Sequence, residues 1–183
     1  MGKVYEAIDE KLATWVAGQH VFFVATAPLG ADGHINNSPK GGDSFRIVNG
    51  SEVAYQDYTG SGAETIAHLR ENGRIVIMFC AFEGPPKIIR FHGHGTVITK
   101  AHPGYAELAQ LFPENLGMRS IIHIDVTRIS DSCGYAVPLC EFRKPRDTLD
   151  RWAANKGEKG LAAYRQDNNV RSIDGLPAFE AED

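Results

Sequence analysis

Two short segments rich in small residues and hydrogen-bonding side chains carry the clearest potential for chemistry. Residues 38–42 (SPKGG) combine a lysine and a hydroxyl with two glycines, and residues 59–62 (TGSG) combine two hydroxyls with two glycines. Glycines leave backbone N–H groups accessible, and amides that precede a helix favour a bound anion, most often phosphate. The alternative interpretation is that both segments are ordinary surface turns, because glycine and serine are also common turn residues.

One predicted β-hairpin joins these two segments. Residues 45–48 and 53–55 suit two strands, and Asn49-Gly50 between them is a strong signal for a tight hairpin turn. The hairpin would place both segments at the same end of a sheet. Residues 64–72 predict a helix directly after the second segment, so the start of that helix would also face a bound anion.

The other predicted elements are mostly strands that follow one another through tight turns. Strands are expected at residues 20–27, 34–37, 74–79, 87–99 and 118–129, and helices at residues 4–17, 102–112, 146–156 and 161–166. Few spacings are long enough for a strand-helix-strand crossover, which favours an antiparallel barrel over a parallel sheet. We therefore predict a single domain over residues 1–183, mainly β, with a barrel over about 5–130 and a C-terminal helical extension over about 131–183.

Histidine and cysteine offer weaker candidates for chemistry. The predicted strand 87–99 would place Arg90, His92 and His94 on one face, but no third ligand accompanies the histidines, so we predict no metal site. The three cysteines lack the paired spacing of a zinc site and are expected to be buried free thiols; they are Cys80, Cys133 and Cys140. Neither a Gly-x-Ser-x-Gly elbow nor a Cys-His pairing points to a nucleophilic triad.

Composition narrows the class of protein. The chain is 43% hydrophobic and 23% charged, as in ordinary globular domains, and its net charge is −4. Lysines and arginines are scattered, which argues against a nucleic-acid surface. An apolar stretch long enough for a membrane span is lacking, and the N-terminus carries acidic residues where a signal peptide would be apolar. We expect a cytoplasmic protein with neither a membrane nor a nucleic-acid partner.

In their order and spacing, these motifs resemble the FMN-binding split barrel of the pyridoxamine 5'-phosphate oxidase family. The resemblance covers roughly residues 5–130 and is carried by the basic segment before the hairpin, by residues 57–60 (DYTG), by 68–74 (HLRENGR), by 75–79 and by 89–93 (IRFHG). It implies an antiparallel split β-barrel of six to eight strands. It also implies a homodimer that holds FMN at the subunit interface, with the phosphate at the hairpin loops and the following helix start.

The resemblance also assigns cofactor-binding residues in this chain by their positions in the shared motifs. The resemblance implies that FMN is bound by Asn37, Ser38, Pro39, Lys40, Gly41, Tyr58, Thr59, Gly60, Ser61, Gly62, Thr65 and Arg90. Two departures stand out, because the family has Ser-Arg-Lys where this chain has Ala63-Glu64-Thr65, and a glutamine where it has Ile88. With fewer cations in the loop, the phosphate would depend more on Lys40, on hydroxyls and on backbone amides.

The function that the resemblance implies is a flavoprotein oxidoreductase acting on a small molecule. Arg90 would lie at the pyrimidine edge of the flavin, where a cation stabilises the reduced ring. Two alternatives remain open: a flavin-binding sensor or store without turnover, and the same barrel with a deazaflavin or haem as its ligand. Catalytic residues and the substrate are not indicated by the sequence.

Overall fold

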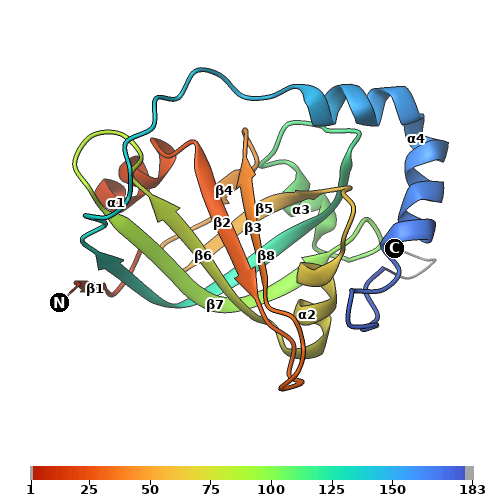
Figure 1. Ribbon diagram of the computed structural model, residues 1–183, viewed down its shortest axis with the longest axis horizontal. Helices are drawn as coiled ribbons and strands as arrows, with labels where there is room; N and C mark the ends of the chain where they lie inside the picture. The colour runs from red at the N-terminus through yellow and green to blue at the C-terminus, as the bar shows by residue number, and fades with distance from the viewer. Residues whose placement is uncertain (1, 180–183) are drawn as a thin grey trace.

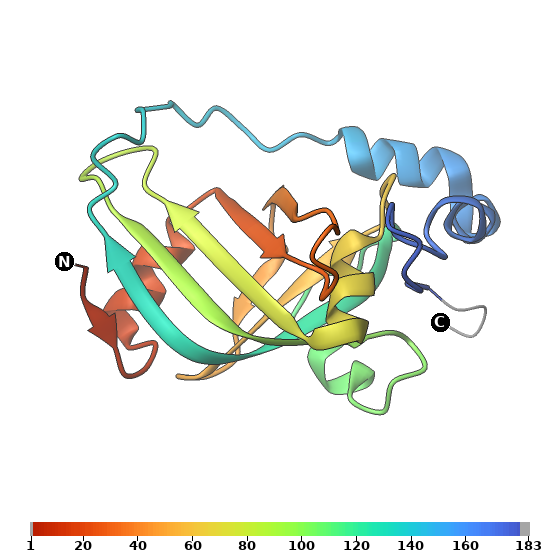
Figure 2. The same ribbon diagram turned by 60° about the horizontal axis from the view of Figure 1, so that its bottom comes forward.

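The computed structural model describes residues 2–179 and contains one antiparallel sheet of eight strands (Figure 1). The strands are β1 (Val4–Tyr5), β2 (Val21–Thr26), β3 (Asn36–Gly41), β4 (Phe45–Ile47), β5 (Glu52–Tyr58), β6 (Arg74–Cys80), β7 (Ile88–Ile98) and β8 (Met118–Ser132). Their order is β3-β2-β6-β7-β8-β5-β4, with β1 paired to β8. The sheet curls into a half-barrel (Figure 2), which confirms the predicted antiparallel split β-barrel.

The main hydrophobic core fills the concave side of this sheet. Buried residues alternate with partly exposed ones along β2 and β6, as expected for strands with one face in the core. Aromatic rings meet at the centre, where the ring centroids of Phe22 and Phe79 lie 5.6 Å apart and those of Phe79 and Phe91 lie 6.0 Å apart. This packing holds the strands that carry the candidate site.

In the described part of the chain, four helices lie around the barrel: α1 (Glu10–Ala17), α2 (Glu64–Asn72), α3 (Tyr105–Ala109) and α4 (Thr148–Asn168). Figure 1 shows α1 and α4 at opposite ends of the long axis, with residues 133–147 running between them along one side of the barrel. The two predicted C-terminal helical pieces form α4, which is interrupted at Gly157, where φ is 64°. No helix within residues 2–179 has the length and apolar character to cross a membrane.

Two sequence-based boundaries need correction, and so does the expected burial of the cysteines: Cys80 is buried, whereas Cys133 and Cys140 are exposed because they lie in the segment that follows β8. The first helix begins at Glu10 and not at residue 4, because the Asp9 carboxylate caps it by accepting the N–H of Leu12 at 2.7 Å. Val4–Tyr5 instead pairs with β8. Residues 38–41, predicted as a loop, belong to edge strand β3. Pro39 fits there because an edge strand pairs on one side only.

Candidate functional site

A cavity of about 590 Å³ opens where β3, the loop after β5 and the start of α2 meet. Eight of the residues that the sequence predicted for the site line it, namely Ser38, Pro39, Lys40, Tyr58, Gly60, Ser61, Gly62 and Thr65. Its volume lies within the ~300 to 1,000 Å³ that is usual for small-molecule sites. The two glycine-containing segments therefore meet in space, as predicted from the hairpin that joins them.

Side-chain hydrogen bonds fix β3 against α2 at this cavity. The Asn36 amide donates to the Thr65 hydroxyl at 3.0 Å, and the Ser38 hydroxyl donates to Asn36 Oδ1 at 3.0 Å. β3 lies at the edge of the sheet, where its strand partner is β2. The bond between Asn36 and Thr65 therefore ties this edge strand to α2 beside the cavity.

A buried ion cluster forms the floor of the cavity. The Asp57 carboxylate accepts from Lys40 Nζ at 2.8 Å and from Arg119 Nε at 2.6 Å. The Asp57 and Arg119 side chains are 1% and 5% exposed, whereas that of Lys40 is 20% exposed and reaches the cavity. Burial would raise the pKa of Asp57, but the charges and hydrogen bonds of Arg119 and Lys40 outweigh it and lower the pKa to about 2.

Arg119 is a site residue that sequence reasoning missed. It lies 62 positions from Asp57, and only the pairing of β5 with β8 brings the two side chains together. A local signal existed, because both residues interrupt apolar strand patterns, and a buried charge on a strand requires an opposite charge. The missing step was the register between the two strands.

The start of α2 adds backbone donors to the same cavity. Its N-cap residue, Ala63, cannot cap the helix with a side chain, and the two residues that follow it, Glu64 and Thr65, both line the cavity. The first N–H groups of a helix have no partner within the helix, and their partial positive charge favours an anion. Lysine, arginine, hydroxyl and amide donors thus converge on a single space.

Four of the predicted site residues do not line this cavity. Asn37 is exposed on β3, Gly41 ends that strand, and Thr59 is fully buried behind the loop. Arg90 lies on the outer face of β7, where its Nη1 donates to Ser132 Oγ at 3.0 Å. Arg90 therefore does not contact the cavity formed by its own chain.

The histidines of β7 share its outer face, as the strand pattern predicted. The three side chains with the geometry for metal ligation among residues 2–179 lie elsewhere, and they are Glu52, His123 and Asp125 on β5 and β8. Of these, His123 Nε2 and Glu52 Oε2 already form a hydrogen bond at 3.0 Å. Neither group of side chains contributes to the cavity described above.

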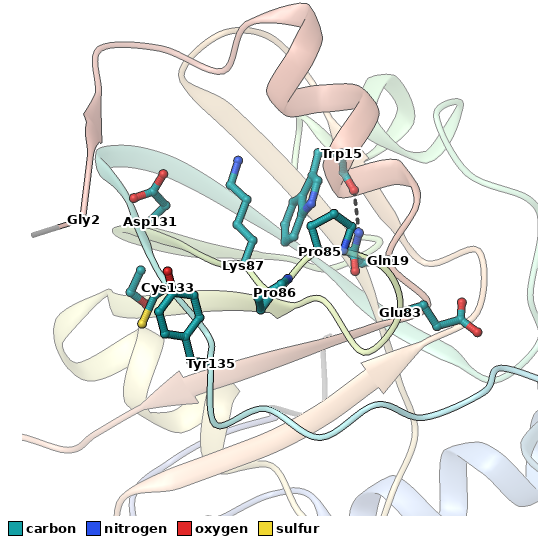
Figure 3. A pocket seen from close by; sticks show the side chains of 11 residues that line it. Gly2, Trp15, Gln19, Glu83, Pro85, Pro86, Lys87, Asp131, Cys133 and Tyr135 are labelled. Carbon is teal, nitrogen blue, oxygen red and sulfur yellow. Dashed lines mark hydrogen bonds between the residues drawn. The ribbon is translucent and has the colours of Figure 1, made fainter.

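A second and larger cavity, of about 950 Å³, lies at the α1 end of the barrel (Figure 3). Its walls include Trp15, Pro85, Pro86 and Tyr135, and its cation is Lys87, whose Nζ lies 5.1 Å from the Trp15 ring centroid. The predicted site residues are absent from its lining. By size alone, this cavity would be the preferred candidate for a binding site. The convergent polar groups favour the smaller cavity instead.

Comparison with known proteins agrees with the fold and also identifies the family. The family model described as pyridoxamine 5'-phosphate oxidase matches residues 8–133. A pyridoxamine 5'-phosphate oxidase family protein, ustO from Aspergillus flavus, is 39% identical over 196 positions, which cover 97% of this chain and 78% of that protein.

Solved structures give the same result for the barrel. HupZ from Group A Streptococcus is 26% identical with a TM-score of 0.52, covering 67% of this chain and 91% of that one. A Clostridium acetobutylicum protein of the pyridoxinephosphate oxidase family, 13% identical, shares the fold with a TM-score of 0.51, covering 69% of this chain and 91% of that one. On the family-model match and the 39% identity, the chain belongs to the pyridoxamine 5'-phosphate oxidase family.

Proposed function

We propose that the chain binds FMN, with its phosphate in the cavity beside α2, and acts as an FMN-dependent oxidoreductase on a small molecule. The observation that carries the proposal is the donor set of that cavity: the Lys40 ammonium, the Ser61 hydroxyl, the Arg119 guanidinium and the amides at the uncapped start of α2. This set suits a phosphate dianion, which accepts charge-assisted hydrogen bonds from several directions. Family membership supports a flavin as the group that bears the phosphate.

The chain's own residues would bind and orient the cofactor. Lys40 donates to Asp57 at 2.8 Å, which holds its ammonium at the wall of the cavity instead of leaving it free in solvent. Bound FMN would supply hydride or electron transfer, for which no protein nucleophile is needed. The protein then contributes position, charge and shielding from water.

A homodimer is part of the same proposal. Phe23 faces Met78 across the β2–β6 pair, and Ala25 faces Val76, so four apolar side chains form a partly exposed strip on the face opposite the core. Arg90 lies beside Met78 on the next strand. A second copy packed on this strip would cover it and bring Arg90 toward the partner's flavin. Sedimentation should show a dimer with FMN bound, and a stable FMN-bound monomer at micromolar concentration would contradict this.

The absorbance spectrum of the purified protein, before and after incubation with FMN, tests the proposed function. The expected result is a yellow protein with flavin bands, whose bound flavin is reduced by a physiological electron donor and reoxidised by an acceptor. Bound FMN that never turns over would favour the sensor or store. Bands of a deazaflavin or of haem would show that the same barrel uses another ligand.

A further inference from the structure

The C-terminal half of α4 contacts the 59–62 loop through residues that do not line the cavity. Arg165 donates from Nε to the Thr59 hydroxyl at 2.8 Å and from Nη2 to the Met118 carbonyl at 3.1 Å. Just after the helix, the Asn169 side chain donates to the Gly60 carbonyl at 3.0 Å, and Asn169 itself is fully buried. This part of the chain follows residues 8–133, which the family model matches. The family model therefore does not cover the residues that make these contacts.

Arg119, which lines the cavity, makes a further contact to the loop. Its Nη1 donates to the Gly62 carbonyl at 2.8 Å, while its Nε is held by Asp57. The C=O and N–H groups of one trans peptide unit point in opposite directions. Because the Gly60 carbonyl faces Asn169, which does not line the cavity, the N–H group of Ser61 points away from Asn169, toward the side on which Ser61 lines the cavity.

The same side chains place positive charge next to a loop that has none of its own. Residues 59–65 contain one charged side chain, Glu64. Both acceptors of Arg165 are neutral oxygens, so within residues 2–179 its charge is not cancelled by a carboxylate. Burial, followed by the nearby charge of Arg119, lowers the pKa of Arg165, which is consistent with two guanidinium groups close together at this site.

We propose that Arg165 and Asn169 of the C-terminal segment, together with Arg119, are positioning residues that hold the 59–62 loop with its amides toward the phosphate of FMN. The two arginines also supply the positive charge that the loop lacks. The inference rests on the proposed FMN function and goes beyond it, because it makes α4 part of the cofactor site. The bend at Gly157, where a positive φ favours glycine, turns the second half of α4 toward the barrel (Figure 1).

Measured affinities for FMN and riboflavin separate this role from general support of the fold. Arg165→Met should weaken FMN binding by roughly tenfold or more, since a charge-assisted contact to the loop is lost. Riboflavin, which lacks the phosphate, should change by no more than about twofold. Arg165→Lys keeps the charge and should recover part of the FMN affinity. Arg151→Met is the matched control, because Arg151 is exposed on the first half of the same helix and pairs with Asp147.

A double-mutant cycle tests the contact itself. Thr59→Val removes the hydroxyl that Arg165 contacts, so its effect on FMN affinity and that of Arg165→Met should be less than additive. If Arg165→Met does not fold, Arg165→Lys and Thr59→Val, compared singly and together, give the same information. Additive effects, or equal losses of FMN and riboflavin affinity, would overturn the inference while leaving the proposed function standing. A wild-type protein that binds no FMN would overturn the proposed function and this inference with it.

Discussion

The two ends of the barrel differ in the kind of cavity that they hold. The α1 end has the larger one, about 950 Å³, in which Lys87 lies over the Trp15 ring and the wall includes two carboxylates, Glu83 and Asp131, but no second cation among the described residues. The α4 end has the smaller one, about 590 Å³, with a buried carboxylate between two cations and an uncapped helix start. We propose the phosphate site at the α4 end because cations and helix amides converge there, although the cavity at the α1 end is larger.

The largest expected effect concerns the ion cluster at the α4 end. Asp57→Ala would leave Arg119 buried without its carboxylate, so the free energy of unfolding should fall by about 3 to 5 kcal/mol in urea denaturation. Asp131→Ala is the comparison at the α1 end, where the carboxylate accepts from Tyr5 near the surface, and should cost about 1 kcal/mol. Equal losses at the two ends would remove the energetic distinction between them.

Lys40→Ala tests whether the smaller cavity binds the phosphate. FMN affinity should fall about tenfold or more, and riboflavin affinity much less, because a charge-assisted hydrogen bond is worth about 1.5 to 3 kcal/mol. Titrations followed by flavin fluorescence would measure both. The exposed Lys100→Ala serves as the control for a lost surface charge. Similar losses for FMN and riboflavin would place Lys40 away from the phosphate.

Acid should weaken the α4 end through Asp57. Burial alone would raise the pKa of this carboxyl, but Arg119 and Lys40 lower it to about 2 from its ordinary value of 3.8. A folded pKa below the unfolded one gives stability that is present above the unfolded pKa and lost as pH falls toward about 2. The expected loss is about 2 kcal/mol. Unfolding measured from about pH 5 to about pH 2 should show a shallower decline in Asp57→Asn, and identical slopes would argue against it.

Arg90→Met examines the sheet face between the two ends. If a partner subunit brings Arg90 to a flavin, loss of its positive charge should lower the midpoint potential, because the reduced ring carries more negative charge. A contact of ~1 to 3 kcal/mol corresponds to roughly 20 to 65 mV for a two-electron couple. A redox titration would measure this. An unchanged or raised potential, with FMN affinity intact, would mean that Arg90 does not serve the flavin.

The smallest effect is expected at the α1 end. Lys87→Met would remove the cation above the Trp15 and Tyr5 rings and should lower the free energy of unfolding by about 0.5 to 1 kcal/mol. FMN affinity should stay the same, as measured by the same fluorescence titration. A loss of FMN affinity comparable to that of Lys40→Ala would instead make the larger cavity part of the cofactor site.

Local signals predicted the elements that hold the site. The structure confirmed the hairpin around Asn49-Gly50 and the helix over residues 64–72, which ends at Gly73 with φ 71°. Both were predictable because turns and helix caps depend on residues that are adjacent in the sequence. The loop predicted from the turn residues at 38–41 was wrong, because these residues pair with β2 and form a strand. Cytoplasmic location and the absence of a nucleic-acid partner stay predictions.

Contacts between distant residues were beyond the reach of the sequence pattern. Arg119 meets Asp57 only through the register of β5 and β8, and Arg165 meets Thr59 across 106 positions. Neither separation leaves a periodic signal, because the pairing depends on how the whole barrel closes. The resemblance supplied the loop residues but not the C-terminal ones, since the family match stops at residue 133.

A crystal structure of the protein with FMN tests the central claim most directly, because it places the phosphate at one end of the barrel or the other. We expect the phosphate within hydrogen-bond distance of Lys40, Ser61 and the first amides of α2, with the 59–62 loop held by Arg165 as it is in the structure described above. FMN bound instead in the larger cavity between Trp15 and Lys87 would contradict the account.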